Sequence, residues 1–136
     1  MLCAQLERRE QVLGRRREIY ELYGKRLSEV AGIGLQPVAS WAVVSPWLFS
    51  ITVNAEEFGV TRDELMQRLS ERGIETRPFF IPLHTLPPFR EGSRRRGEEL
   101  PVTVALAGTG INLPTFSTMT DAEVERICDV IAQLQR

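Results

Sequence analysis

Hydrophobic residues recur with helical spacing along the first thirty positions. A seven-residue interval runs through this stripe, and neighbouring apolar residues widen it. Only Gly14 and Gly24 interrupt an otherwise helix-favouring stretch, and a helix tolerates single glycines. The pattern predicts a long amphipathic helix from Leu2 to about Val30 with one buried face. The stripe consists of Leu2, Leu6, Leu13, Ile19, Tyr20, Tyr23, Leu27 and Val30.

The opposite face of this helix is rich in arginine and glutamate. Two functions fit such a face: a nucleic-acid patch, or a solvated surface with ion pairs at helical spacing. The acidic residues interleave the arginines, which favours the solvated surface. A coiled-coil seam is a further alternative, but Arg9 and Arg16 fall where its other core position would lie, which argues against it.

Three later stretches have the composition of strands. Trp47–Val53 is aromatic and β-branched, and it begins apolar on both faces, as expected of a central strand. Trp47 itself is expected in the core, although it could face a ligand. Ile74–Arg77 and Ile111–Leu113 are predicted as shorter strands, and Val38–Ser45 as a strand edge or a connection.

Two capping boxes mark the starts of helices. In each, a threonine precedes a glutamate by three residues: Thr61 with Glu64, and Thr120 with Glu123. Gly73 suits the end of the first helix. Pro101 suits the start of a short helix through Ala107, whereas 90–99 is polar and is predicted as a mobile surface loop. The last helix has one apolar face: Val124, Ile127, Cys128, Ile131 and Leu134.

Together these elements predict an α+β fold. We expect a two-layer sandwich in which a sheet of three or four strands carries helices on one face. Residues 1–30 would form a long connecting helix, and residues 31–136 a small C-terminal domain. A chain of 136 residues with 43% hydrophobic content is enough for one such core.

Charge and cysteine content limit the partners and the cellular compartment expected for the protein. A net charge of −1 gives no global field for nucleic acid or an anionic membrane. No apolar run approaches the roughly 20 residues of a membrane span, so neither partner is expected. Cys3 and Cys128 lack metal-ligand spacing, which predicts no metal site and two buried, reduced thiols in a cytoplasmic protein.

The segment 73–89 concentrates the chemistry of the chain. It holds the only histidine, four of the eight prolines and three of the six phenylalanines. Its prolines impose an extended, stiff backbone, which presents Arg77 and His84 from non-helical positions. The segment is either a ligand-binding rim or an aromatic and proline-rich plug that packs the domain, and its composition leaves both open.

The residues of this segment resemble a known family. Gly-Ile-Glu-Thr-Arg-Pro-Phe-Phe-x-Pro-Leu-His followed by Pro-Pro-Phe is similar to the C-terminal part of the PLP-dependent nucleotide-sugar aminotransferases of the DegT/DnrJ/EryC1/StrS family, most of all its perosamine synthase branch. Ala4–Arg8, Trp47–Ile51 and Ile111–Thr115 match further family segments in the same order, so the resemblance covers nearly the whole chain.

The resemblance implies a reaction and a division of labour. The parent enzyme would move an amino group from glutamate or glutamine to a keto-sugar nucleotide, as a homodimer. Its catalytic lysine and PLP-binding residues would lie in a large domain preceding Met1 and absent here. The only lysine, Lys25, has no glycine- or serine-rich phosphate loop nearby. We therefore expect no catalytic, cofactor-binding or metal-binding residue in this chain, and no activity from it alone.

By position, the resemblance makes Arg77, His84 and Phe80 the substrate-binding residues. Arg77 would bind a carboxylate or phosphate in bidentate fashion, and His84 would donate to a sugar hydroxyl or phosphate oxygen. Two departures leave the substrate undecided: Ile81 replaces a tyrosine common in the family, and no arginine lies close to the last strand in 108–112.

Two alternatives concern partners. The domain would be a non-catalytic module that complements a separate PLP-binding chain or a protein partner, or an RNA binder through the arginine-rich helix. The interleaved glutamates and the lack of an aromatic platform disfavour RNA. Whether the chain is an aminotransferase fragment or a non-catalytic module, an uncovered apolar stripe predicts a homo-oligomer through the long helix.

Overall fold

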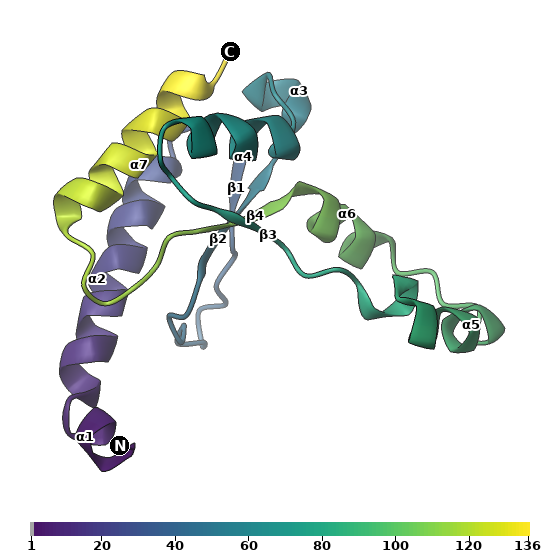
Figure 1. Cartoon of the computed structure of the whole chain (residues 1–136), viewed down its shortest axis with the longest axis horizontal. Coiled ribbons are helices and arrows are strands. Elements are labelled where there is room, and N and C mark those ends of the chain that lie inside the picture. Colours follow the sequence, from purple (N-terminus) through teal and green to yellow (C-terminus); the bar gives the residue numbers. More distant parts are fainter. Residues whose placement is uncertain (1) are drawn as a thin grey trace.

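The structure is a computed structural model that describes residues 2–136, apart from the side chains of Leu2, Ala4 and Gln5 (Figure 1). Four strands form one antiparallel sheet in the order β1-β2-β4-β3. The strands are β1 (Ile33–Leu35), β2 (Phe49–Val53), β3 (Arg77–Pro78) and β4 (Gly110–Leu113). The helices are α1 (Leu2–Glu7), α2 (Arg9–Leu27), α3 (Ala55–Phe58), α4 (Arg62–Glu71), α5 (Pro87–Arg95), α6 (Pro101–Thr109) and α7 (Asp121–Leu134), with a 3-10 turn, η1 (Leu83–Thr85).

Strand β2 is central, as its composition predicts. Ile51 pairs with Leu35 of β1 on one side and with Ile111 of β4 on the other. Alternate residues of β2 are buried, beginning and ending with Phe49 and Val53. This period-two burial directs the apolar face of the sheet toward the helices.

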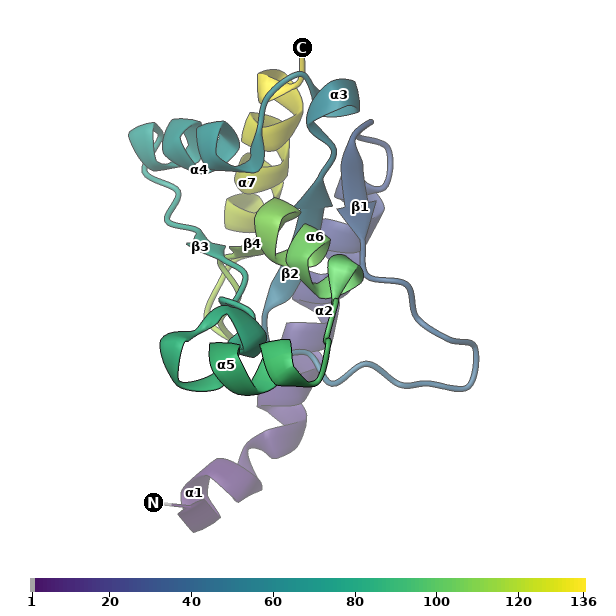
Figure 2. The ribbon, with the colours of Figure 1, turned by 90° about the vertical axis from the view of Figure 1, so that its right-hand side faces the viewer.

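The core lies between that face and α2, α4 and α7 (Figures 1 and 2). Ile19, Tyr23 and Leu27 of α2 are fully buried, and all five residues predicted for the apolar face of α7 are buried. The predicted α+β fold, with a small sheet and helices packed on one face, is confirmed. Figure 2 shows α6 beside the opposite face, where none of its side chains is buried.

The long first helix is interrupted at Arg8, between α1 and α2. The second half of its apolar stripe packs inside the chain, whereas Leu6 is 58% exposed and Leu13 is half-buried. Among the described side chains of the stripe, a homo-oligomer through the long helix would therefore have chiefly Leu6 and part of Leu13 available. That assembly stays a prediction.

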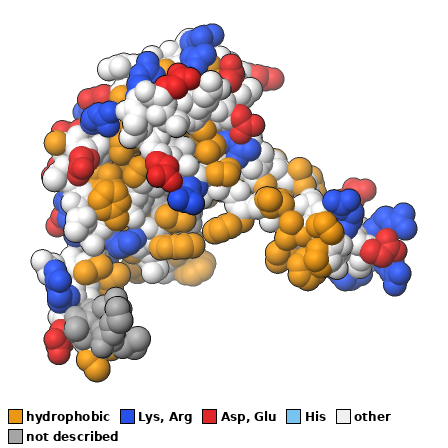
Figure 3. Space-filling model, viewed as in Figure 1, with side chains coloured by type: hydrophobic (Ala, Val, Ile, Leu, Met, Phe, Trp, Pro, Cys, Tyr) orange, Lys and Arg blue, Asp and Glu red, His pale blue; other side chains and the backbone are white. Residues whose placement is uncertain are grey.

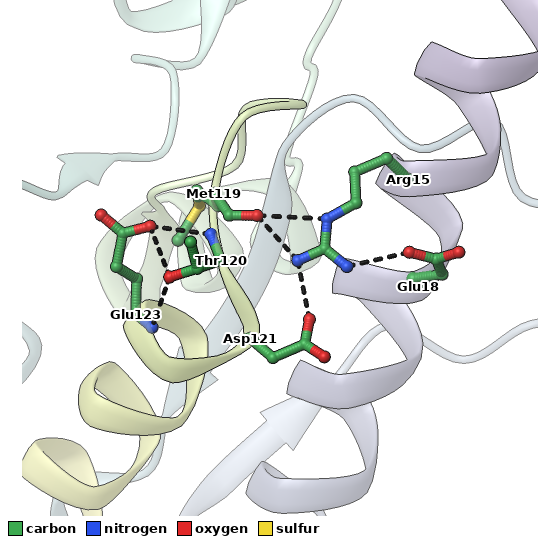
Figure 4. Close-up of polar contacts among 6 residues, drawn as sticks. All are labelled: Arg15, Glu18, Met119, Thr120, Asp121 and Glu123. Carbon is green, nitrogen blue, oxygen red and sulfur yellow. Dashed lines mark hydrogen bonds and ion pairs between the residues drawn. The ribbon is translucent and has the colours of Figure 1, made fainter.

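Both capping boxes are present. The Thr61 hydroxyl accepts from the Glu64 backbone N–H, and the Glu64 carboxylate accepts from the Thr61 N–H. Thr120 and Glu123 make the same exchange (Figure 4). The backbone hydrogen bond from Thr120 lowers the pKa of Glu123. Gly73 follows the end of α4 with a φ of 72°, the left-handed conformation that favours glycine there.

Arg15 fastens α2 to the start of α7 (Figure 4). Its Nε and Nη2 donate to the Met119 carbonyl at 3.1 and 2.7 Å. Nη2 also donates to Asp121 at 2.7 Å, and Nη1 donates to Glu18 at 2.8 Å. These carboxylates raise the pKa of Arg15 through hydrogen bonds. One side chain thus joins segments more than a hundred positions apart.

An Arg15→Ala variant is expected to lower the free energy of unfolding by about 1–2 kcal/mol, because the Met119 carbonyl loses a charged donor. Urea denaturation measures the change. Arg17→Ala is the matched control: Arg17 is exposed on the same helix, and its loss should change stability by less than about 0.5 kcal/mol. Equal effects from both variants would show that the contact with Met119 contributes nothing.

Several predictions about local structure are wrong. Residues 90–99 do not form a loop throughout, since α5 continues to Arg95. Pro87 and Pro88 begin this helix at positions where a missing N–H costs nothing, and Glu91 pairs with Arg95 one turn later at 3.1 Å. The predicted strand 74–77 is reduced to Arg77–Pro78.

Two residues expected in the interior lie outside it. Trp47 is 63% exposed, because the buried alternation of the strand begins only at Phe49. Cys3 is exposed, whereas Cys128 is buried, and burial raises the pKa of its thiol to about 12. The segment 38–45 is a connection that leaves the sheet (Figure 2).

Candidate functional site

An open groove of ≈ 740 Å³ runs along the edge strand β3. The segment after α4 (73–75), the end of β4 and the first turns of α7 form its other walls. Of the three residues predicted to bind substrate, Arg77 and Phe80 line this groove. Its remaining chemistry comes from Glu75, Glu123, Arg126 and an apolar floor that includes Leu113 and Ile127.

Trp47 and Phe80 form an aromatic pair at this groove. Their ring centroids are 6.5 Å apart and their planes are inclined by only 18°. Both side chains remain largely exposed, at 63% and 74%. The pair also borders a second, smaller hollow of ≈ 280 Å³ that contains Ser45, Ser50 and Asn112. Two nearly parallel aromatic faces therefore stand between two hollows.

The backbone under Trp47 is fixed by α2. Arg16 Nη1 donates to the Trp47 carbonyl at 2.6 Å, and the Tyr20 hydroxyl donates to the neighbouring Leu48 carbonyl. Tyr20 in turn packs edge-on against Phe49, with centroids 5.1 Å apart. The side chain of Trp47 is exposed, but its main chain is held.

The backbone under Phe80 is fixed by β4. The Phe79 N–H donates to the Gly110 carbonyl at 3.2 Å, and the Phe79 ring lies directly over Gly110, where a Cβ atom would come within 2.3 Å of it. Asn112 donates from Nδ2 to the Pro78 carbonyl at 3.3 Å and accepts from the Ser50 hydroxyl at 2.7 Å. The segment enters the groove between two anchored residues.

Arg77 is an exposed cation at the groove. Its only ion pair among the described residues is with Glu75, at 2.9 Å, and both side chains are about 80% exposed. Such exposed pairs contribute little to stability. The guanidinium can therefore exchange Glu75 for a carboxylate or phosphate without leaving the groove.

His84 is not brought to this groove. It lies half-buried in the 3-10 turn η1, near Glu98, whose pKa falls to about 2 mainly through hydrogen bonds from Arg96 and Ser93. The expectation that one extended backbone presents both Arg77 and His84 is thus corrected, because the chain turns after Pro82. A role for His84 in binding stays a prediction.

Residues 81–109, which we call the arm, extend away from the sheet (Figure 1). Most of its large apolar side chains are uncovered, and Figure 3 shows hydrophobic surface gathered there, with charged groups at its tip. The exposed apolar residues are Ile81, Leu83, Phe89, Leu100, Val102, Val104 and Leu106. An apolar surface of this extent is typical of an interface.

Lys25 does not fit a PLP site. It is exposed on the last turn of α2, in a hollow that also contains the carboxylates of Glu29 and Asp129. Acidic neighbours would repel the cofactor's phosphate, and Arg26 is already paired with Asp129. This hollow shares no lining residue with the groove. We therefore assign no step of PLP chemistry to the described residues.

Residues 2–136 contain neither a cluster of metal-ligating side chains nor a membrane-spanning helix. In this part of the chain, no group of three His, Cys, Asp or Glu side chains is placed to hold a metal ion. Nor does any helix of these residues have the length and apolar content needed to cross a bilayer.

Solved structures with the same fold include an aminotransferase. DesV from S. venezuelae, solved in complex with a ketimine intermediate, matches 99% of this chain with a TM-score of 0.87 and 26% identity. TlmJ from Streptoalloteichus hindustanus matches with a TM-score of 0.82 and 27% identity over 97% of the chain. The chain spans 35% and 34% of these two proteins.

The chain belongs to the DegT/DnrJ/EryC1/StrS aminotransferase family, whose profile matches residues 1–132. It is 38% identical over 130 residues to GDP-perosamine synthase of Vibrio cholerae, and 34% identical over 129 residues to that of Escherichia coli O157:H7. These alignments cover 94% of the chain but only 34% and 33% of the relatives. The resemblance inferred from 73–89 is confirmed.

The aromatic partner of Phe80 was missed in the sequence. Aromatic composition before a central strand indicates core, and that rule placed Trp47 inside. The available signal was Pro46, which directly precedes Trp47 and is not expected inside a central strand.

Proposed function

We propose that this chain supplies the small-domain part of a PLP-dependent nucleotide-sugar aminotransferase. The observation that carries the proposal is 38% identity to a GDP-perosamine synthase across 94% of the chain. Amino transfer from glutamate or glutamine to a GDP-linked keto-sugar follows as the favoured reaction. The PLP lysine and phosphate cradle would belong to the part of the relatives that this chain does not match.

In this arrangement the described residues bind and orient the substrate. Arg77 contributes a permanent cation for a phosphate or carboxylate group, and the planar guanidinium suits two parallel hydrogen bonds. Phe80 contributes an apolar surface beside it. The groove is apolar at its floor and charged at its rim, a combination typical of sites that fix a small ligand with a few polar contacts.

A second candidate function is an assembly module that complements a separate PLP-binding chain. The arm favours it, because α6 lies beside the sheet with no buried side chain and Val102 is 70% exposed. Contact between these apolar side chains and water is unfavourable, and a docked partner would remove them from water. The two candidates differ in whether the PLP-binding part is covalently joined.

One experiment separates these candidates. Residues 1–136 are supplied to the unmatched N-terminal part of the Vibrio cholerae relative either as a fusion or as a separate chain. The fusion is expected to transfer an amino group to a GDP-linked keto-sugar, measured by mass spectrometry of the product. Activity from separate chains at micromolar concentration would favour the assembly module, and no activity in either form would contradict both.

The site within the fusion is tested by Arg77→Ala. Loss of a charge-assisted contact to substrate is expected to lower kcat/KM at least about tenfold, with bound PLP unchanged in its absorbance spectrum. Arg94→Ala, which removes an equally exposed arginine from the arm, is the control.

The chain alone should give no PLP adduct at Lys25 after borohydride reduction. A stoichiometric adduct there would contradict the assignment of PLP binding to the part of the relatives that this chain does not match.

A further inference from the structure

We propose that the Trp47–Phe80 pair is the stacking platform for the nucleobase of a nucleoside diphosphate, with the diphosphate directed to Arg77. The inference rests on the proposed function for the nature of the ligand. It adds a residue, Trp47, and a defined subsite to the groove that contains Arg77.

The geometry of the pair suits a flat aromatic ligand. Two side chains stacked for stability alone normally bury much of each other, yet these remain 63% and 74% exposed. At 6.5 Å between centroids and 18° between planes, most of each ring face is free to contact another ring. Bases stack on such faces regardless of sequence because every base has a π-face.

The pair is also held in advance of binding. Arg16 fixes the Trp47 carbonyl at 2.6 Å, and the ring of Phe79 over Gly110 fixes the residue before Phe80. Both rings are exposed, yet each lies on a backbone segment that a separate contact fixes. Pre-organised contacts reduce the entropy that a ligand loses on binding.

The distance to Arg77 matches a nucleotide. Phe80 lies three positions after Arg77 along the chain, a reach of up to about 10 Å, which is close to the span from a base to its diphosphate. Both residues line the same groove. Glu75 and Glu123 also line it, but Glu75 is bound to Arg77 itself and Glu123 is engaged with Thr120. A phosphate would displace Glu75 and take its place on the guanidinium.

A protein partner is the competing occupant, and the surroundings argue against it here. The hollow on the other side of the pair has polar side chains, Ser45, Ser50 and Asn112, among its aromatic lining. A protein interface centred on Trp47 would bury these groups, whereas a nucleotide sugar supplies hydroxyls to them. The large apolar surface that a protein would cover lies on the arm instead.

The two tryptophans make a direct test possible. The chain contains only Trp41 and Trp47, so ¹⁵N-labelled protein gives two indole N–H signals, assigned with Trp41→Phe. Titration with GDP is expected to shift the Trp47 signal saturably, with half-saturation in the millimolar range, and to leave that of Trp41, which is 88% exposed, unchanged. Inorganic pyrophosphate and guanosine should each bind more weakly than GDP.

Two variants sharpen the result. Phe80→Ala is expected to weaken GDP binding on the order of tenfold, the effect of one base–aromatic stack, while Phe116→Ala, an exposed phenylalanine of the same groove, should weaken it less than about twofold. No saturable shift of Trp47, equal shifts of both tryptophans, or equal effects of the two variants would overturn the proposal.

The outcome is separable from that of the proposed function. A GDP-dependent shift of Trp47 with an inactive fusion would retain the nucleotide subsite and remove the aminotransferase assignment. An active fusion whose KM is unchanged by Trp47→Leu would retain the aminotransferase and remove the subsite.

Discussion

A Tyr23→Ala variant is expected to lower the free energy of unfolding by about 3–5 kcal/mol, the usual effect of deleting a fully buried aromatic side chain. Tyr23 is 0% exposed at the contact between α2 and the sheet. Its ring stacks on Phe49 with centroids 4.8 Å apart and planes inclined by 23°. Since small domains are stable by about 5–15 kcal/mol, the loss takes a large part of the total.

The hydroxyl of Tyr23 allows this effect to be divided. It donates to the Pro114 carbonyl at 3.0 Å, directly after β4, and burial raises the pKa of Tyr23. Tyr23→Phe keeps the ring and removes only this donor, so it should cost about 1–2 kcal/mol. The difference between the two variants is then the contribution of the buried ring.

Urea denaturation followed by circular dichroism measures both variants. Glu21→Ala is the control, because Glu21 is exposed on the same helix and its loss should stay within about 0.5 kcal/mol. If Tyr23→Ala costs no more than Tyr23→Phe, the ring is not part of the core and the packing of α2 on the sheet is wrong.

The core was predictable because local signals and burial agree in it. Thr61 and Thr120 cap helices whose apolar faces follow directly, and Ile51 lies in a β-branched strand. Each of these positions is specified by several rules at once: capping, periodicity and propensity. The sequence predicted the buried face of α7 residue by residue for the same reason.

The groove and the arm were harder because their residues break the burial rule. Trp47 and Val102 are apolar yet exposed, and a sequence pattern assigns such residues to a core. Arg77 and Phe80 were found only through a family resemblance, since one cation and one ring have no periodicity. Sequence reasoning fails where apolar groups serve a ligand or partner, which makes these failures informative about function.

The turn after Pro82 illustrates a different limit. Prolines fix φ of single residues and favour extended geometry before them, so the stretch from Arg77 to His84 was predicted to be stiff and extended. Pro82 instead precedes a 3-10 turn in which the Thr85 hydroxyl donates to the Pro82 carbonyl at 2.8 Å. One such local hydrogen bond redirects the chain, and composition does not encode it.

A Gly110→Ala variant is expected to lower kcat/KM of the active fusion on the order of a hundredfold, the effect of displacing a positioned group by about 1 Å. Gly110 begins β4 with an ordinary φ of −83°, so the backbone itself accepts alanine. The obstacle is Phe79, three of whose ring atoms would lie 2.3–2.5 Å from the new Cβ. The ring must move, and the adjoining Phe80 moves with it.

Gly108→Ala provides the matched control for this variant. Gly108 lies two residues earlier, inside α6, and a Cβ there meets nothing within 4 Å, so alanine should be neutral or stabilise by up to about 1 kcal/mol. Gly110→Ala should in addition abolish the GDP-dependent shift of Trp47 while costing only about 1–3 kcal/mol of stability. An active Gly110→Ala fusion with normal GDP binding would show that Phe79 does not position the groove, and the site would then have to be built on the arm rather than on the edge of the sheet.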